Sequence, residues 1–473
     1  MRRLVWFRGK DLRVNDHGPL YDAQEAAACV FVLDPYFFAP ERAQQMANRI
    51  AFLLESLQEL QHSISSLGGQ LIVVSGRSTE VIPRLAQKLN VDEVVAHRWT
   101  EPFARIRDEQ VAKALHVPFR LYEGETLLPP GQVLTGKDRP YSVFTPYSRM
   151  FEKIFEPSPP LPAPKRIRSI RPPLNLRSVS IPTPDDLNLK TSPKRLYGGE
   201  AAARERLTRF IQDRLFNYDT NRDQMGMSDT SRLSQDLKFG TISVRTLWDR
   251  VMSEMVPSLG REAFLRQLIW REFSHSCLWH RPSLLETPFR ESWREFPWAD
   301  NDEGWERWTT GQTGFPIVDA SARELLATGF VHNRARMVSA SFLTKHLRID
   351  FRRGESHYMK HLTGGDWAQN TAGWQWAAGC GFDAQPYFRV FNPMRQGERF
   401  DPKGQYVRKW VPELSRLSNR YIHAPWTAPK DCLEDAGLVL GRNYPYPIVD
   451  HASARKDYLE LARNFLRPPT DTE

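Results

Sequence analysis

The sequence predicts an α/β domain with a parallel, doubly wound sheet, followed by a domain built almost entirely of helices. Short β-rich runs alternate with amphipathic helical stretches through the first 125 residues. After about residue 201, strand signals become scarce while helical patterns recur. Because strands that are separated by helices join through right-handed crossovers, the first part is expected to form a parallel sheet.

The expected strands are short and apolar, and they cover residues 4–8, 29–34, 71–75, 94–96 and 119–122. The longest helix between them is expected over 43–67, where apolar residues recur at helical spacing. No Gly-x-Gly-x-x-Gly follows the first strand, so the usual dinucleotide-binding fingerprint is missing. The α/β pattern therefore predicts a fold class without predicting a ligand.

A proline-rich segment separates the two parts. Nine prolines lie within residues 157–184, and proline removes backbone donors and fixes φ, so we expect an extended linker over the surface. The predicted domains are an α/β domain at 1–130, a linker at 131–200 and a helical domain at 201–473. Helices of the last part are expected at 261–278, 319–327, 333–345 and 453–465.

Composition narrows the class of protein. With 41% hydrophobic and 26% charged residues, the chain is an ordinary globular protein. No apolar run approaches the roughly 18 residues of a membrane-spanning helix, and we expect no signal peptide. The four cysteines are far apart, which favours free thiols in the cytoplasm and predicts no metal site. The net charge of +9 favours a polyanionic partner such as nucleic acid, although solubility explains it almost as well.

Six groups of motifs follow one another along the chain. They are Trp6-Phe7-Arg8 with Asp11-Leu12-Arg13, Tyr218-Asp219 with Thr230-Ser231-Arg232-Leu233-Ser234, Trp270-Arg271-Glu272-Phe273, His332-Asn333-Arg334-Ala335-Arg336-Met337, Gly365-Asp366-Trp367-Ala368-Gln369-Asn370 through Gly373-Trp374-Gln375-Trp376, and Phe388-Arg389-Val390-Phe391-Asn392-Pro393. By these motifs the chain resembles the photolyase/cryptochrome family, closest to class I cyclobutane pyrimidine dimer photolyases. The resemblance runs from Leu4 to about Leu414. It implies FAD in the helical domain and light-driven electron transfer from reduced FAD to a pyrimidine dimer flipped out of DNA.

The resemblance implies the following FAD-binding residues: Tyr218, Thr230, Ser231, Arg232, Leu233, Ser234, Asn333, Arg336, Gly364, Gly365, Asp366 and Asn370. Thr230, Ser231 and Ser234 would hold the pyrophosphate at a loop-to-helix junction, and an ordinary capping cluster is the alternative. Asn370 would face flavin N5, where a carboxamide accepts a hydrogen bond from N5–H. In the family Arg336 pairs with Asp366. Because Gly364 replaces an aspartate that is frequent two residues before Asp366, we expect Asp366 to balance Arg336 alone.

The resemblance also implies a lesion pocket, whose DNA-binding residues are Gln267, Trp270, Arg271, Asn333, Arg334, Met337 and Trp376. Trp270 and Trp376 would form aromatic walls and Arg271 would neutralise a phosphate, with core packing and a solvated charge as the alternatives. Met337 stands where (6-4) photolyases carry a second catalytic histidine, which argues against (6-4) specificity. Gln267 replaces a glutamate, so it can donate a hydrogen bond to the dimer but no proton, and we expect less efficient repair.

Electron transfer to the flavin uses three tryptophans in the family. The match places them at Trp374, residue 351 and Trp298, but residue 351 is Phe351, which is far harder to oxidise than indole. The usual relay is therefore expected to be interrupted, with Trp376 as a hypothetical detour. The catalytic residues implied in all are Gln267, Met337, Asn370, Trp298, Trp374 and Trp376.

Two further expectations concern cofactors. An antenna chromophore, a folate or a deazaflavin, is expected between the domains, and the residues after Trp99 lack the Asn-Glu pair of a folate-binding pattern. His357 and His361 have a spacing that a metal can use, but a solvated helix face is the favoured interpretation.

The resemblance thus implies a deoxyribodipyrimidine photo-lyase that repairs pyrimidine dimers in damaged DNA, and we expect it to be a monomer. The alternatives are a cryptochrome-like blue-light photoreceptor with little or no repair activity, and a light-independent FAD-binding DNA protein.

Overall fold

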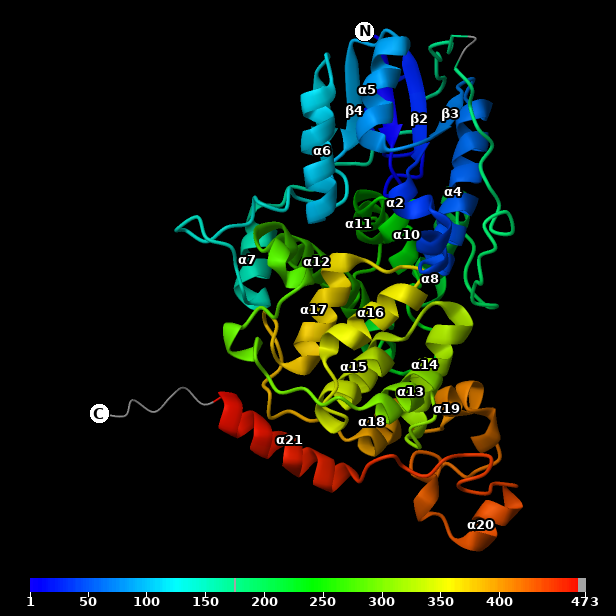
Figure 1. The fold of residues 1–473 in the computed structure, drawn as a ribbon, viewed down its shortest axis with the longest axis vertical. Coiled ribbons are helices and arrows are strands. Elements are labelled where there is room, and N and C mark those ends of the chain that lie inside the picture. Colours follow the sequence, from blue (N-terminus) through cyan, green and yellow to red (C-terminus); the bar gives the residue numbers. More distant parts are fainter. Residues whose placement is uncertain (174–175, 467–473) are drawn as a thin grey trace.

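A five-stranded parallel sheet forms the N-terminal domain, at the top of Figure 1. The structure is a computed structural model that describes residues 1–173 and 176–466. The strands are β1 (Arg3–Phe7), β2 (Ala27–Leu33), β3 (Leu71–Ser75), β4 (Glu93–His97) and β5 (Phe119–Tyr122), in the order β3-β2-β1-β4-β5. Every neighbouring pair is parallel, so the predicted doubly wound α/β domain is confirmed.

Helices cover both faces of this sheet. They are α1 (Gly18–Ala23), α2 (Pro35–Phe38), α3 (Pro40–Gln44), α4 (Ala47–Ser66), α5 (Ser78–Lys88) and α6 (Pro102–Ala114). Because side chains alternate along a strand, Val5 and Phe7 of β1 join the core under α4, whereas Leu4 and Trp6 join the core under α5. The single helix expected over 43–67 is divided into α3 and α4.

The strand order creates a crevice beside β1. From β1 the chain passes to β2 and β3 on one side of the sheet, then returns to β4 and β5 on the other. In open α/β sheets, ligands bind at such a switch point, outside the carboxyl ends of the strands. Here the residues that follow β1 and β4 include Arg8, Lys10 and Trp99.

The segment predicted as a linker contains one helix, α7 (Phe144–Ile154). Its Phe144 and Phe151 pack with Ile269 and Phe273, so α7 contributes to a core of the helical domain. Between α7 and residue 199, the described residues form no helix or strand. Part of this stretch lies along the sheet, where Ser169 forms an isolated bridge with Ala27.

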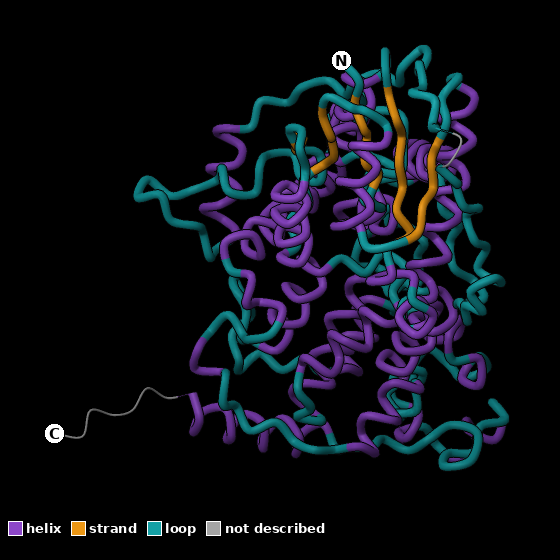
Figure 2. Tube along the Cα trace, turned by 45° about the horizontal axis from the view of Figure 1, so that its top comes forward, coloured by secondary structure: helices purple, strands orange, loops and turns teal. Residues whose placement is uncertain are grey.

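The second domain is helical, and Figure 2 shows the strands confined to the opposite end of the molecule. Its α-helices are α8 (Glu200–Asp213), α9 (Tyr218–Asn221), α10 (Ser234–Phe239), α11 (Val244–Met252), α12 (Leu259–His280), α13 (Asp302–Thr310), α14 (Pro316–Thr328), α15 (Asn333–Ser341), α16 (Phe351–His361), α17 (Trp367–Ala378), α18 (Pro393–Phe400), α19 (Gln405–Trp410), α20 (Lys430–Asp435) and α21 (His451–Leu466). Short helical turns add η1 (Pro282–Leu285), η2 (Glu291–Trp293), η3 (Phe342–His346), η4 (Pro412–Leu414) and η5 (Pro425–Thr427). The helix expected over 333–345 is α15 continued by η3, a π-helical turn.

Among the described residues, no helix is both long and apolar enough to cross a membrane.

A buried network of charges joins the two domains. Lys10, which follows β1, forms ion pairs with Glu101 and Glu125, which follow β4 and β5. From the helical domain, Lys238 of α10 lies 3.2 Å from the same carboxylate of Glu101. Burial alone would lower the pKa of Lys10, but the adjacent carboxylates outweigh it and raise that pKa. The carboxyl ends of three strands are therefore held to the helical domain by ion pairs shielded from water.

We expect Lys10→Met to destabilise the protein by about 3–5 kcal/mol, because it leaves the carboxylates of Glu101 and Glu125 buried without their cation. Unfolding in urea, followed by far-UV circular dichroism, measures the loss. As the control, Arg77→Ala removes an exposed ion pair with Glu80 and should change stability by no more than about 0.5 kcal/mol. Equal midpoints for the two variants would contradict the role given to the network.

Candidate active site

Two motifs that are far apart in the sequence meet where α10 begins. Residues 230–234 form the turn that leads into this helix, and Arg232 adopts a left-handed conformation with φ of 55°. Gly364 packs against the turn so closely that an added Cβ would lie 2.8 Å from the backbone nitrogen of Gln235. Only glycine fits at position 364. The hydroxyl-bearing turn and the loop 364–366 therefore form one cradle, whose Thr230 and Ser231 are half-buried and whose Ser234 is exposed.

Helix α17 starts at this cradle and carries the residue expected to face flavin N5. Asp366 caps the helix, with its Oδ1 accepting a hydrogen bond of 2.9 Å from the backbone N–H of Gln369. One turn later, Asn370 is 2% exposed and its Nδ2 donates to the backbone oxygen of Glu355 at 3.1 Å. Its Oδ1 is buried and has no hydrogen-bond partner among the described residues. An acceptor oriented in this way fits the N5–H group of a reduced flavin.

The prediction that Arg336 pairs with Asp366 is wrong. Asp366 instead turns toward the domain interface, where its Oδ2 lies 3.6 Å from His275 Nε2. Although burial would raise it, the pKa of Asp366 is lowered by the charges of His275 and Lys10. Arg336 has no carboxylate within ion-pair distance in the described parts of the chain, and its Nε is buried without a partner. Its guanidinium remains available to a negatively charged ligand.

The other residues expected at FAD differ in their surroundings. Tyr218 lies edge-on to Phe264, with ring centroids 5.3 Å apart, and burial raises its pKa to about 12. Leu233 is 1% exposed and belongs to the hydrophobic core beneath α10. A Cβ at Gly365 would lie 3.2 Å from Met359 Sδ, so this glycine also closes a tight contact.

Helix α15 presents part of the expected lesion-binding set. Asn333 is exposed, and its Nδ2 lies 3.6 Å from the sulfur of Met337, so these two side chains share one face of the helix. Arg334 forms a 2.9 Å ion pair with Asp223, and its guanidinium lies 4.2 Å from the centroid of the Phe400 ring. The assignment of these side chains to DNA stays a prediction.

Helix α12 carries Gln267, Trp270 and Arg271 in different environments. Gln267 is half-buried, and the Trp270 ring stacks on Phe144 at 3.8 Å with an interplanar angle of 6°. The expected phosphate contact of Arg271 is not supported. Its side chain is 3% exposed and donates a 2.7 Å hydrogen bond to the backbone oxygen of Glu125. Arg271 therefore fixes the strand ends to α12, and a DNA phosphate does not reach it in this conformation.

The aromatic residues expected to conduct electrons are only partly connected. Trp374 is 1% exposed, Trp298 is half-buried, and the Trp298 ring lies 6.3 Å from that of Phe351. Across the described residues, no ring contact links Trp376 to Trp374 or Trp298. Positions two apart on a helix face different directions, which explains why Trp376 does not extend the relay.

The histidines expected on a solvated helix face are instead packed. His357 is half-buried with its ring 5.5 Å from Trp308, and burial lowers its pKa to about 3. A separate buried cluster unites Asp11, His17 and His97. Because His17 Nδ1 accepts a hydrogen bond from the backbone N–H of Leu20, its proton resides on Nε2, which faces Asp11. Because Nε2 carries the proton, His17 offers no free lone pair to a metal on the side that faces Asp11.

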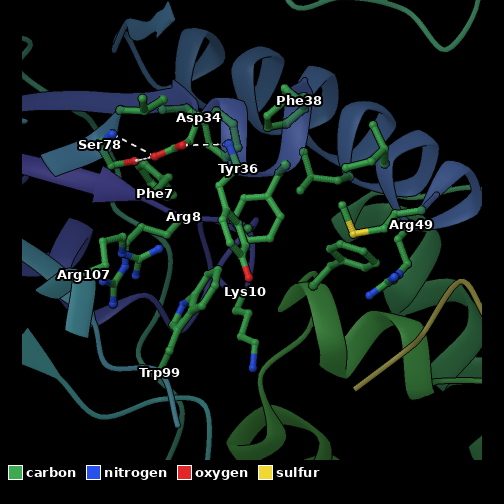
Figure 3. A pocket seen from close by; sticks show the side chains of 18 of the residues that line it. Phe7, Arg8, Lys10, Asp34, Tyr36, Phe38, Arg49, Ser78, Trp99 and Arg107 are labelled. Atoms are coloured by element: carbon green, nitrogen blue, oxygen red, sulfur yellow. Dashed lines mark hydrogen bonds between the residues drawn. The ribbon is translucent and has the colours of Figure 1, made fainter. Parts of the chain in front are cut away.

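The sequence reasoning did not identify the residues of a cavity at the domain interface, which Figure 3 shows from close by. It lies at the switch point of the sheet and encloses about 830 Å³ of empty space, part of it open to solvent. Tyr36 and Trp99 project into it, with Arg8 and Arg107 on one side and Arg49 on the other. The strand order, with polar and aromatic residues after β1 and β4, is the signal that locates such a site.

The cavity combines aromatic walls with two cations that have no carboxylate within ion-pair distance among the described residues, Arg42 and Arg49. Its other cationic lining residues are paired: Lys10 and Lys238 with Glu101, and Arg8 and Arg107 with Asp108. Asp34 is its one lining carboxylate in the described part of the chain, and this group accepts hydrogen bonds from Ser78 and from the backbone N–H of Tyr36. Burial and the nearby Arg42 lower the pKa of Arg49 to about 10. These features favour a flat, anionic ligand.

The pKa of Glu355 generates a prediction about stability and pH. Burial raises this pKa from 4.5 to about 8, so the folded protein holds the group neutral at pH 7. Between these values the unfolded chain loses a proton that the folded protein keeps, and stability falls by up to roughly 1.4 kcal/mol per pH unit. Glu355→Gln should remove this fall, so that the variant gains stability relative to wild type from pH 5 to pH 8. Urea unfolding at both pH values measures the gain, and Glu286→Gln, at an exposed glutamate, should show none.

Comparisons with known proteins agree with this arrangement of motifs. Residues 3–165 match the DNA photolyase model, and residues 264–464 match the FAD binding domain of DNA photolyase. A deoxyribodipyrimidine photo-lyase of Agrobacterium fabrum is 38% identical over 463 residues, which cover 96% of each chain. A class III photolyase structure from Agrobacterium tumefaciens superposes with a TM-score of 0.90 at 36% identity, covering 98% of this chain and 97% of that one. A Synechocystis cryptochrome structure gives 0.88 at 31% identity, covering 97% and 99%. Because a relative that is 38% identical covers 96% of this chain, and both domains match models of DNA photolyase, this chain belongs to the photolyase/cryptochrome family.

Proposed function

We propose that this protein repairs cyclobutane pyrimidine dimers in DNA by light-driven electron transfer from bound reduced FAD. The observation that carries the proposal is the buried, unpartnered Oδ1 of Asn370, next to the cradle formed by residues 230–234 and 364–366. When bound, reduced FAD supplies the electron that opens the cyclobutane ring and then receives it back, so the reaction is redox-neutral. Relatives over nearly the full length of the chain are deoxyribodipyrimidine photo-lyases.

The side chains of this protein would support the reaction in four ways. Asn370 accepts a hydrogen bond at flavin N5, and the unpaired guanidinium of Arg336 balances the negative charge of reduced flavin. Trp270, already stacked on Phe144, offers an aromatic surface to the flipped lesion. Gln267 donates a hydrogen bond through its side-chain amide to a carbonyl of the dimer, where negative charge arrives.

The class of photolyase is a narrower question. The motifs favour class I, and the similarity to a class III photolyase structure leaves that assignment a prediction. The cryptochrome-like alternative is favoured by one observation, the close superposition of the Synechocystis cryptochrome. The fold is common to both activities, so repair has to be measured directly. The monomeric state and cytoplasmic location also stay predictions.

Repair is tested by incubating the chemically reduced holoprotein with a thymine-dimer oligonucleotide and counting restored thymines. We expect restoration under blue or near-UV light and none in the dark. Gln267→Glu, which can transfer a proton, should increase repair per absorbed photon. Gln267→Leu, which donates no hydrogen bond, should lower it by about tenfold or more. Flavin-loaded protein that binds the dimer but restores no thymine in light would instead support the photoreceptor alternative.

We further propose that the cavity at the domain interface holds the antenna chromophore, a planar anionic ring system of the deazaflavin class. Tyr36 and Trp99 provide aromatic contact, and Arg49 and Arg42 provide positive charge that no carboxylate of the described residues neutralises. The absence of the Asn-Glu pair after Trp99 supports a deazaflavin over a folate. The site lies next to Trp367, the first residue of α17, and so close to the proposed flavin site.

Arg49→Met should weaken binding of added deazaflavin to the flavin-loaded protein by about tenfold, because a half-buried cation that faces the ligand is lost. Fluorescence titration measures the affinity. Arg84→Met, at an exposed arginine outside the cavity, is the matched control and should bind as wild type does. Tighter binding of a folate than of deazaflavin would overturn the choice of chromophore, and unchanged affinity in Arg49→Met would overturn the choice of cavity.

A further inference from the structure

We propose that oxidised flavin in this protein is photoreduced through Trp374, Trp308 and Trp305, which form a route that does not use position 351. The proposal rests on the proposed function, since it requires FAD bound next to Trp374. It assigns an electron-transfer role to Trp308 and Trp305, which the sequence motifs did not single out.

The expected tryptophan relay is interrupted at a position that is buried from solvent. Phe351 is 2% exposed, its ring lies 6.3 Å from that of the half-buried Trp298, and it matches the middle position of the family's relay. A phenyl ring is much harder to oxidise than an indole. Positive charge on Trp374 therefore has no intermediate carrier on the way to Trp298.

A second series of rings leads from Trp374 to the surface. The Trp374 and Trp308 centroids are 6.0 Å apart, and both side chains are 1% exposed. Trp308 stacks on Trp305 at 5.6 Å with an interplanar angle of 26°, and Trp305 is half-buried. Both residues lie on α13, three positions apart, which places them on one side of that helix. Each step of this route is a contact between indole rings.

The surroundings of Trp308 favour a transient positive charge there. Its Nε1–H donates a 3.2 Å hydrogen bond to the backbone oxygen of Ser339, and this carbonyl dipole stabilises an oxidised indole. Tyr358 also touches Trp374, with centroids 5.1 Å apart, but the guanidinium of Arg336 lies 5.3 Å from its ring centroid. That cation disfavours a second positive charge on Tyr358.

Trp305 is the last tryptophan of the route, and the charged groups around it affect how easily its ring is oxidised. The guanidinium of Arg353 lies 4.6 Å from the Trp305 centroid, which alone would disfavour oxidation of this ring. Asp302 lies 3.1 Å and Asp300 3.9 Å from the same guanidinium and offset its charge. Arg353 is therefore expected to tune the last step without being part of the route.

Each electron that moves along the route has a defined donor and a defined acceptor. After light absorption, Trp374 gives one electron to the flavin, Trp308 gives one to Trp374, and Trp305 gives one to Trp308. A thiol reductant in solution then gives one electron to Trp305 and is itself oxidised. The net change is one electron from the thiol to the flavin, and the tryptophans end as they began.

The test is photoreduction of the purified, oxidised holoprotein in blue light with dithiothreitol, followed at the flavin absorption band. Trp308→Phe and Trp305→Phe should each slow the reduction by about tenfold or more. Trp426→Phe, at a half-buried tryptophan that contacts Phe315 outside the route, is the matched control and should reduce at the wild-type rate. Transient absorption gives an independent readout: in Trp305→Phe the tryptophan radical should recombine with the flavin faster, because the charge no longer reaches the surface. In Arg353→Gln, the radical on Trp305 should live longer than it does in wild type.

A second variant tests whether slow photoreduction in Trp308→Phe results from misfolding. Phe351→Trp, added to Trp308→Phe, should restore fast reduction by completing the route to Trp298, and the flavin content of all variants should match wild type. Wild-type rates in both Trp308→Phe and Trp305→Phe would overturn the proposal, as would a loss confined to Trp298→Phe. Repair by dithionite-reduced protein is measured separately. Its absence together with photoreduction through Trp305 would refute the proposed repair and leave this route intact.

Discussion

The structure depends on a set of buried charges where the sheet meets the helices. Lys10 lies between Glu101 and Glu125, and Lys238 adds a second cation from the helical domain. Each of these groups would be costly to bury alone, so each is stable only while the others stay in place. The carboxyl ends of the strands, the last turn of α10 and the start of α17 are consequently held in one arrangement.

This constraint also determines the chemistry of the proposed flavin site. Asp366 faces the interface network and caps α17, so it cannot also neutralise Arg336. With glycine at position 364, the Arg336 guanidinium and the Asn370 carbonyl oxygen have no hydrogen-bond partner in the part of the chain that the structure describes. A neighbouring cation and an acceptor near N5 both favour a reduced, negatively charged flavin. Domain packing and cofactor chemistry are thus linked through one aspartate.

Aromatic residues of this protein have two proposed roles, chromophore binding and electron transfer. Around the interface cavity, Tyr36 and Trp99 stand among arginines and suit an anionic ring. In the helical domain, Trp374, Trp308 and Trp305 form a ring series with much less positive charge along it. The difference in local charge separates a site that binds a chromophore from a path that carries oxidising equivalents.

The sequence by itself determined the elements whose signal is local. Alternating apolar runs predicted all five strands to within a few residues, and helical spacing predicted α12, α14 and α21. Motif order indicated the family and the residues around Asn370. Where two local patterns follow each other, the prediction was less complete, since the helix at 333–345 continues as a π-helical turn.

Only the tertiary structure decided which partners the charged and aromatic side chains meet. Arg271 turned inward to Glu125, which follows β5 of the other domain, and Asp366 turned to His275 of α12. The contact between Trp374 and Trp308 joins helices whose residues are 66 positions apart, so no periodicity reveals it. The propensity for helix or strand depends on neighbouring residues in the sequence. Burial, ion pairing and ring contact depend on which distant parts of the chain pack beside a residue.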